Sequence, residues 1–173
     1  MEKIENILKK RVLLLDGAMG TMIQKYNLEE KDYRGCSFSN HKSSLQGNND
    51  LLSLTKPEII EKIHTEYLES GADIIETNTF NANKISQSDY NLENYVFDMN
   101  FQSAKIARSV INKFNKKNKE AKFVCGSIGP TNRTASLSPK VEDLSFRNIT
   151  FDELYDAYYE QIDGLVKGGV DLL

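Results

Sequence analysis

The sequence has no tryptophan, only three prolines and only two cysteines. Cys36 and Cys125 are too few to form a disulfide framework, so we expect both thiols to be reduced. No stretch approaches the roughly 18 apolar residues that a membrane-spanning helix needs. The N-terminus lacks the long apolar region and the small-residue cleavage site of a signal peptide. These absences argue against a secreted or membrane protein and predict a cytoplasmic one.

An excess of basic charge is also missing. Lys and Arg total 22 against 25 Asp and Glu, which gives a formal net charge of -3. The basic run at 113–122 is typical of a solvated turn, and no basic cluster stands beside aromatic residues. We therefore expect neither a nucleic acid nor a membrane as a partner. The length, 173 residues, is enough for one domain with a sizeable core.

Apolar periodicity predicts an alternation of strands and helices. We expect helices over the first ten residues and over 55–71, 92–115 and 150–169, and strands at 12–15, 73–78, 123–130 and from 170 onward. This β-α-β-α-β-α-β order predicts an α/β fold with a parallel sheet. The unbroken apolar run at 12–15 predicts a strand that is covered on both faces. The connection from about 22 to 54 is too long for plain linkage, so we predict a functional loop there.

Local signals set the ends of two expected helices. The pairs Thr55–Glu58 and Thr150–Glu153 have the spacing of capping boxes. Pro57 suits a first helical turn, where its missing N–H costs nothing. Gly71 and the pair Gly168–Gly169 predict the helix ends.

Polar and glycine-rich residues follow the expected strands. Asp16 and Gly17 end the first strand, Glu76 ends the second, and a glycine-rich stretch at 126–132 follows the third. Because the carboxyl ends of parallel strands share one edge, these clusters should converge there. Peptide N–H groups between Gly17 and Gly20 could reach a small anion such as a carboxylate, and ionised Asp16 and Glu76 could receive an ammonium group. Together the two features suit a zwitterionic amino acid.

Each feature also has a plainer interpretation. Asp16 and Gly17 could form a simple turn, and Glu76 could cap a helix or pair with a lysine. "DGAMG" is not the GxGxxG fingerprint of dinucleotide-binding folds. The agreement between three strand ends favours a binding site over these alternatives.

A metal site built from the histidines and cysteines is not favoured. The candidates are Cys36, His41, His64 and Cys125, and no close pair of cysteines accompanies them. His64 lies next to the apolar stripe of its expected helix. Cys125 lies inside an expected strand, where a small core hydrophobe is the simpler interpretation. We predict no metal ligands in this chain.

Five blocks of the sequence resemble the N-terminal homocysteine-binding region of cobalamin-dependent methionine synthases. The blocks are "VLLLDGAMGTMIQ", "GNNDLLSLTKPEII", "GADIIETNTFNAN", "GSIGPTNRTASLSP" and "FRNITFDEL". They occur in the family's order and extend the resemblance from about residue 10 to the end. "GNNDLL" and "NRTASLSP" point to methionine synthase rather than to relatives that use betaine or S-methylmethionine.

The resemblance implies a (β/α)8 TIM barrel that holds homocysteine beside a zinc ion. In that family the zinc activates the thiol, and the sulfur takes a methyl group from methylcobalamin on another module to form methionine. A second barrel then restores the methyl group from methyltetrahydrofolate. The substrate-binding residues implied here are Asp16, Gly17, Ala18, Met19, Glu76, Thr77, Asn78, Thr79, Phe80, Gly126, Gly129 and Asn132.

The sequence departs from this family in length. It stops at "VDLL", where the fourth strand starts, so we expect residues 1–173 to form the N-terminal half of the barrel, with about three and a half βα units. The family's three zinc-binding cysteines, including a Gly-Gly-Cys-Cys ending, belong to the other half. We therefore expect the fragment alone to bind no zinc or methylcobalamin and to be inactive. Its expected partners are homocysteine, the remaining half-barrel and the folate- and cobalamin-binding modules.

Two alternatives remain open at this stage. The first is a zinc-dependent homocysteine methyltransferase with another donor, such as betaine. The second is a non-catalytic half-barrel that pairs with another chain.

Overall fold

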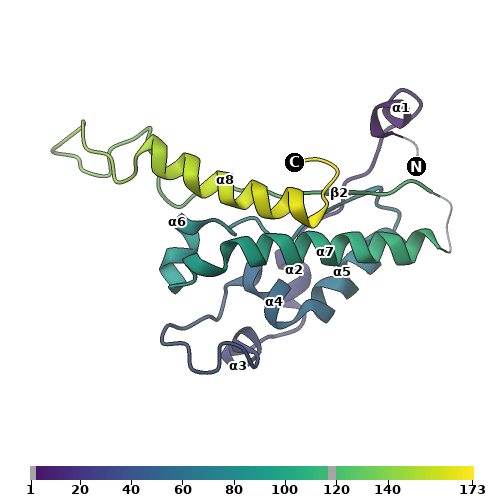
Figure 1. The fold of residues 1–173 in the computed structure, drawn as a ribbon, viewed down its shortest axis with the longest axis horizontal. Coiled ribbons are helices and arrows are strands. Elements are labelled where there is room, and N and C mark those ends of the chain that lie inside the picture. Colours follow the sequence, from purple (N-terminus) through teal and green to yellow (C-terminus); the bar gives the residue numbers. More distant parts are fainter. Residues whose placement is uncertain (1–2, 117–119) are drawn as a thin grey trace.

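The structure is a computed structural model that describes residues 3–116 and 120–173 (Figure 1). The first two residues of the expected N-terminal helix, and residues 117–119 of the basic run, lie outside the described residues. The elements are α1 (Ile4–Leu8), α2 (Met19–Gln24), α3 (Glu30–Arg34), η1 (Asn49–Leu51), α4 (Leu52–Thr55), α5 (Pro57–Glu69), β1 (Ile74–Glu76), α6 (Lys84–Gln87), η2 (Ser88–Tyr90), η3 (Glu93–Tyr95), α7 (Val96–Asn115), β2 (Phe123–Cys125) and α8 (Phe151–Gly168).

The sheet is parallel, as the alternation of elements predicted. β1 and β2 pair in parallel, with Glu76 opposite Cys125. Isolated parallel bridges extend the sheet on both sides, from Leu15 to Ile74 and from Cys125 to Leu172. The four expected strand segments therefore lie side by side in the order of the sequence.

Long helices cover one face of this sheet. Ile75 and Val124 are completely buried and pack with Leu68 of α5 and with Ile111 of α7. α7 and α8 lie side by side (Figure 1), and Gly164 and Gly168 lie where the two helices approach closely. A Cβ atom at Gly168 would lie 2.5 Å from the Cβ of Ala104 on α7, well inside van der Waals contact.

A short sequence repeat marks the amino ends of two strand segments. "GADII" at 71–75 and "GVDLL" at 169–173 each begin with a glycine at positive φ, +103° for Gly71 and +96° for Gly169, just after a helix ends. The predictions that these glycines end the helices are confirmed. Two residues later the aspartate accepts a peptide N–H from the neighbouring strand segment: Asp73 from Leu14 at 3.0 Å, and Asp171 from Val124 at 2.8 Å.

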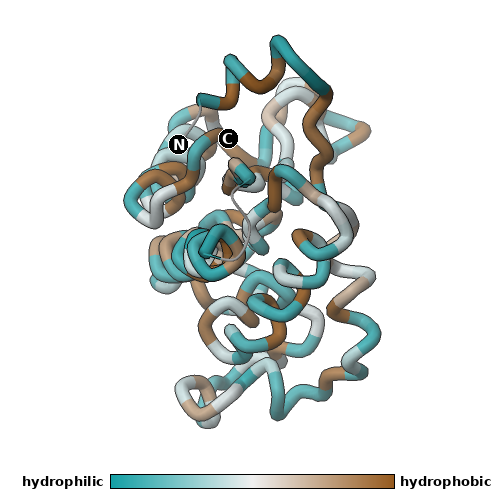
Figure 2. The backbone as a smooth tube through the Cα atoms, turned by 90° about the vertical axis from the view of Figure 1, so that its right-hand side faces the viewer, coloured by the Kyte–Doolittle hydropathy of each residue, from teal (hydrophilic) through white to brown (hydrophobic). Residues whose placement is uncertain are grey.

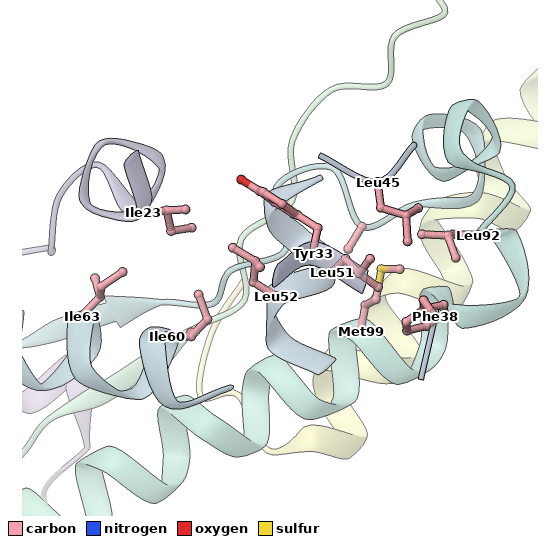
Figure 3. Packing of buried hydrophobic residues seen from close by; sticks show 11 residues of the cluster. Ile23, Tyr33, Phe38, Leu45, Leu51, Leu52, Ile60, Ile63, Leu92 and Met99 are labelled. Carbon is pink, nitrogen blue, oxygen red and sulfur yellow. The ribbon is translucent and has the colours of Figure 1, made fainter. Parts of the chain in front are cut away.

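The 22–54 segment, predicted as a loop, is an ordered layer with helices of its own. Glu30 accepts the peptide N–H groups of Leu45, at 2.9 Å, and of Gln46, at 2.7 Å, and so folds the segment back on α3. Its apolar side chains form a core against Ile60 and Ile63 of α5 (Figure 3). The buried members contributed by the segment are Ile23, Tyr33, Phe38, Leu45, Leu51 and Leu52.

One of the two predicted capping boxes is absent. Thr55 does not cap α5: its hydroxyl donates to the carbonyl of Leu51 at 3.4 Å, because Thr55 is the last residue of α4. Lys56 occupies the N-cap position of α5, and Pro57 follows in the first turn as predicted. The Thr150–Glu153 box of α8 is formed in both directions.

The apolar run at 12–15 is not covered on both faces, so that prediction is wrong. Val12, Leu14 and Leu15 are 80%, 59% and 52% exposed, and the run is brown in Figure 2. The reason is that α5 and α7 pack on Ile75 and Val124 of the central strands, whereas the run is attached to the sheet edge through its backbone. The predicted helix at 92–115 likewise begins later, at Val96, after the 3-10 turn η3.

Candidate functional site

A cavity of about 410 Å³ opens at the carboxyl end of the sheet, and we call it the main cavity. Four segments that are distant in the sequence line it. These are residues 16–20 after the first strand segment, 49–50 from the 22–54 segment, 76–81 at the end of β1, and Ser127 after β2. The ends of the first two strand segments therefore meet in one cavity, as predicted, whereas only Ser127 of the predicted stretch 126–132 lines it.

Asp16 is fixed to the end of β1. Its peptide N–H donates to the carbonyl of Ile74 at 2.9 Å, and its Oδ2 accepts the peptide N–H of Glu76 at 3.1 Å. Its other oxygen, Oδ1, is buried and has no hydrogen-bond partner among the described residues. Asp16 and Glu76 thus lie together at the same edge, and both line the main cavity.

The surroundings of Asp16 favour its protonated form. Burial raises the pKa of the carboxyl to about 7, helped by the negative charge of Glu76 and opposed by the hydrogen bond from the Glu76 peptide. Near neutral pH, Asp16 can therefore either donate or accept a hydrogen bond. The lining residues include Asp16, Asp50 and Glu76 but no lysine, arginine or histidine within the described part of the chain, so the main cavity is acidic.

Gly17 is tightly packed, whereas Gly20 is not. A Cβ atom at Gly17 would lie 3.0 Å from the hydroxyl of Tyr67. Burial, together with the charge of Asp16, raises the pKa of Tyr67. A Cβ atom at Gly20 would meet only the amide nitrogen of Asn49, at 3.8 Å, an ordinary contact.

Two threonines shape the wall between β1 and β2. The peptide of Thr77 donates to the carbonyl of Cys125 at 2.9 Å, and its hydroxyl accepts the peptide N–H of Ser127 at 2.9 Å. The hydroxyl of Thr79 donates to the carbonyl of Ser127 at 2.7 Å and lies 2.6 Å from that of Thr77. Both hydroxyls are used in holding the two strand ends together.

Asn49 and Asp50, which no sequence pattern identified as site residues, line the main cavity together with Gly20, Asn81 and Ser127. The carbonyl of Asn49 accepts the side-chain amide of Asn78 at 2.7 Å, and Oδ1 of Asp50 accepts the peptide N–H of Asn81 at 2.9 Å. The only available signal was the "GNNDLL" block. Because it does not follow a strand, only the packing of the 22–54 segment brings it to this edge.

The other predicted site residues divide into two groups. Those at 16–19 and 76–80 line the main cavity. Gly126, Gly129 and Asn132 do not. A Cβ atom at Gly126 would lie 2.7 Å from Leu173, the peptide of Gly129 donates to the carbonyl of Phe80 at 3.0 Å, and the amide of Asn132 donates to Asp89 at 2.7 Å.

The described residues do not fit a zinc ion. Residues 3–116 and 120–173 contain no group of three His, Cys, Asp or Glu side chains able to hold a metal. Cys36 is exposed, and Nε2 of His41 lies 2.7 Å from the carbonyl of Tyr90. His64 is completely buried, and burial lowers its pKa to about 4. Cys125 is only half-buried rather than part of the core, and burial raises its pKa.

No helix in these same described ranges has the length and apolarity needed to cross a membrane.

Known structures share this fold. The homocysteine methyltransferase MmuM from Escherichia coli, in its metallated form, matches with a TM-score of 0.71 and 21% sequence identity, over 98% of this chain and 55% of that one. Its oxidized form gives the same values, and its apo form matches with a TM-score of 0.61 and 20% identity, over 96% and 50% of the two chains. This chain thus spans about half the length of those structures and has the corresponding part of their barrel fold. The homocysteine S-methyltransferase family matches residues 13–173, nearly the whole sequence, and the chain belongs to that family.

Proposed function

We propose that this chain is the homocysteine-binding part of a methyltransferase and that homocysteine occupies the main cavity. The observation that carries the proposal is the meeting of Asp16 and Glu76, from neighbouring parallel strand segments, in a cavity whose described lining residues include no basic side chain. An acidic cavity favours a ligand with an ammonium group. The peptide groups of Gly17–Gly20 lie beside these carboxyls and suit the carboxylate of the same amino acid.

The remaining wall suits the thiol-bearing side chain. Met19 and Phe80 line the main cavity, and Phe80 is 54% exposed. These apolar groups would contact the methylene groups of homocysteine, and Thr77 and Thr79 would keep the wall in shape. Homocysteine would then accept a methyl group at its sulfur, forming methionine.

We further propose that residues 1–173 form the N-terminal half of the barrel, with about three and a half βα units, in a cytoplasmic methionine synthase. The thiolate is the nucleophilic form of the substrate, and a coordinating zinc ion deprotonates a thiol. Because the described residues offer no ligand set, we assign zinc to the remaining half of the barrel. The donor would be methylcobalamin, recharged by methyltetrahydrofolate on a further module. On this proposal the isolated chain is catalytically silent.

Calorimetric titration with L-homocysteine tests the binding proposal. We expect the wild-type chain to bind and Asp16→Asn to weaken binding about tenfold, the cost of one hydrogen bond to a charged group. Asp152→Asn serves as the control, because this exposed residue lies on α8 and does not line the main cavity. Equal affinities for the wild type and Asp16→Asn would remove Asp16 from the site.

The donor requires a separate test, because a homocysteine site is compatible with several donors. The full-length protein that contains this chain should form methionine from methylcobalamin and not from betaine. Turnover with betaine alone would favour the alternative of a homocysteine methyltransferase with another donor.

A second candidate function is a non-catalytic half-barrel that pairs with another chain. Apolar side chains that are exposed at both edges of the sheet favour it: Leu14 and Leu15 at one edge, and Leu173, which is 55% exposed, at the other. Light scattering on the purified chain tests this candidate. A monomer at all concentrations would contradict pairing with a second copy of this chain.

A further inference from the structure

A second hollow, of about 200 Å³, lies beside the main cavity. Asp50 and Asn81 line both spaces, so these two residues form the partition between them. Three parts of the chain meet around the second hollow: the 22–54 segment, the stretch 81–90 that includes α6 and η2, and the loop after β2. Apart from Gly47, every lining residue has a polar side chain.

The lining of the second hollow is rich in oxygen and negatively charged. Asp50 and Asp89 supply two carboxylates, and the other polar groups are side-chain amides and the hydroxyls of Ser86 and Tyr90. The described lining residues include no lysine, arginine, histidine or cysteine. Carboxylate, amide and hydroxyl oxygens are the ligands that hard cations such as Mg²⁺ and Ca²⁺ prefer. An anion would be repelled by this lining, whereas a divalent cation would balance the two carboxylates.

Both carboxylates have an oxygen to spare. Oδ1 of Asp50 accepts the peptide N–H of Asn81 at 2.9 Å, and Oδ2 of Asp89 accepts the side-chain amide of Asn132 at 2.7 Å. The second oxygen of each group has no partner from another residue in the described part of the chain. Asp50 is only 5% exposed, and a buried carboxylate without a cation is costly. A cation in the second hollow would remove that cost.

Ser86 is an independent sign of a ligand. This residue of α6 lines the second hollow and is 8% exposed, and its hydroxyl is buried without a hydrogen-bond partner among the described residues. Buried hydroxyl groups nearly always have a partner, because leaving one unpaired costs free energy. A hydrated cation in the second hollow would provide the missing partner.

The wall of the second hollow is held in a fixed position. The amide of Asn48 donates to Gln87 at 2.7 Å, and the amide of Gln87 donates back to Asn48 at 3.3 Å. Gln87 also donates to the carbonyl of Asn81 at 3.1 Å, on the other side of the peptide group that Asp50 bonds. The carboxylate of Asp50 is therefore oriented before any ligand enters.

The size of the second hollow suits a cation that keeps part of its water. A water molecule occupies about 30 Å³ in the liquid, so the hollow exceeds the volume of a bare ion by several waters. Mg²⁺ gives up its water reluctantly and is usually bound through one or two carboxylates, with water in the other positions. Ca²⁺ is larger and accepts more protein oxygens in a flexible geometry. Either ion can use this lining.

We propose that the second hollow binds one hard divalent cation, Mg²⁺ or Ca²⁺, through the carboxylates of Asp50 and Asp89. Water molecules complete its coordination and bond the hydroxyl of Ser86. The cation joins the 22–54 segment, the stretch 81–90 and the loop after β2, and so fixes the partition that borders the main cavity. This site is distinct from a zinc site, because it has only two carboxylates and neither histidine nor cysteine. The inference does not depend on the proposed function, since the cation would bind without homocysteine.

Calorimetric titration of the wild-type chain tests the proposal. MgCl₂ and CaCl₂ are added in separate experiments, in potassium chloride buffer and without homocysteine, so that only a site selective for divalent ions gives a signal. We expect one ion per chain with a dissociation constant of about 10⁻⁴–10⁻³ M, the range of weak calcium-binding modules. The ion with the higher affinity identifies the occupant. No saturable binding of either ion up to about tenfold above this range would overturn the proposal.

Matched substitutions distinguish the second hollow from the main cavity. Asp89 is exposed and lines only the second hollow, whereas Glu76 lines only the main cavity. We expect Asp89→Asn to weaken the affinity for the better ion by about tenfold or more, and Glu76→Gln to leave it unchanged. Asp152→Asn, on the exposed surface of α8, controls for the loss of one negative charge. An equal or larger loss in Glu76→Gln would place the cation in the main cavity and overturn the proposal, as would an unchanged affinity in Asp89→Asn.

A second measurement needs no substitution, so it does not depend on the folding of a variant. Amide NMR spectra of the wild type are recorded while the better ion is added. The peptide signals of Gly47, Asn48, Asp89 and Asn132 should shift together, with the same concentration dependence. Shifts confined to residues 16–20 would show that the cation binds in the main cavity instead and would overturn the proposal.

Discussion

Asp73 and Asp16 lie at opposite ends of neighbouring strand segments, and their surroundings have opposite charge. Asp73 is 3% exposed and accepts two hydrogen bonds from Arg11, at 2.7 and 2.9 Å, and one from Lys122 at 3.2 Å. The bond from Arg11 is the main reason that the pKa of Asp73 is held well below its usual range. Asp16 has no such partner among the described residues, and burial raises its pKa to about 7.

The two edges of the sheet therefore differ in role: the amino edge stabilises the fold, and the carboxyl edge offers a binding site. At the amino edge, Asp73 and Asp171 each accept a peptide N–H from a neighbouring strand and pair with an arginine, so their charge holds the sheet together. At the carboxyl edge, Asp16 and Asp50 line a cavity that has no lysine, arginine or histidine among its described lining residues. Parallel α/β barrels in general place their active sites at the carboxyl edge and stabilising residues at the other.

The largest expected effect is that of Asp73→Asn. This change leaves the ammonium group of Lys122, whose side chain is 3% exposed, without its buried partner. We expect a loss of about 3–5 kcal/mol in the free energy of unfolding, measured by urea denaturation. Asp171→Asn is the matched comparison and should cost less, because the side chains of its ion pair with Arg108 are 23% and 27% exposed. If Asp73→Asn lowers the free energy of unfolding no more than Asp171→Asn does, this result would contradict the stabilising role of the buried pair between Asp73 and Lys122.

The next effect concerns His64, which lies in the core. Its pKa is about 4 in the folded protein, below the usual 6.5, so the unfolded chain binds a proton first as the pH falls. The stability is therefore full above pH 6.5 and decreases as the pH falls through 4, by up to about 3 kcal/mol. His64→Leu should flatten this part of the curve. An unchanged slope between pH 6.5 and 4 in the variant would show that other groups cause the acid loss.

Asp16→Asn should act in the opposite direction, and more weakly because Asp16 is only partly buried and solvent screens its charge. The raised pKa of Asp16 means that the folded protein keeps its proton longer than the unfolded chain, so this group lowers stability as the pH rises from 4 to 7. We expect the variant to melt about 2–4 °C higher than the wild type at pH 8 and at the same temperature at pH 4. A lower melting temperature of the variant at pH 8 would show that the charge of Asp16 stabilises the fold. This result would contradict the difference between the two edges.

The smallest effect is expected for the amide pair between Asn48 and Gln87. A double-mutant cycle with Asn48→Ala and Gln87→Ala should give a coupling of about 1 kcal/mol in the free energy of unfolding. The two amides bond to each other, and each single change leaves a buried group unpaired. Additive losses would show that the pair does not tie the 22–54 segment to the loop after β1.

Local signals in the sequence predicted much of the carboxyl edge. Asp16 and Glu76 each follow an apolar run, and parallel pairing of those runs is enough to bring them together. Asp50 could not be found this way, because its position depends on the tertiary packing of the 22–54 segment against α5. Thr55 does not cap α5 for a similar reason. Its spacing to Glu58 is that of a capping box, but Thr55 is the last residue of α4. The Gly-x-Asp repeat at 71–73 and 169–171 was visible in the sequence and marks the amino edge.

Amide NMR spectra recorded during titration with L-homocysteine test the division between the two edges most directly. We expect the peptide signals of residues 16–20, 49–50 and 76–81 to shift, and those of 71–73 and 169–171 to stay in place. Shifts that cluster at 71–73 and 169–171, or no shifts anywhere, would contradict it.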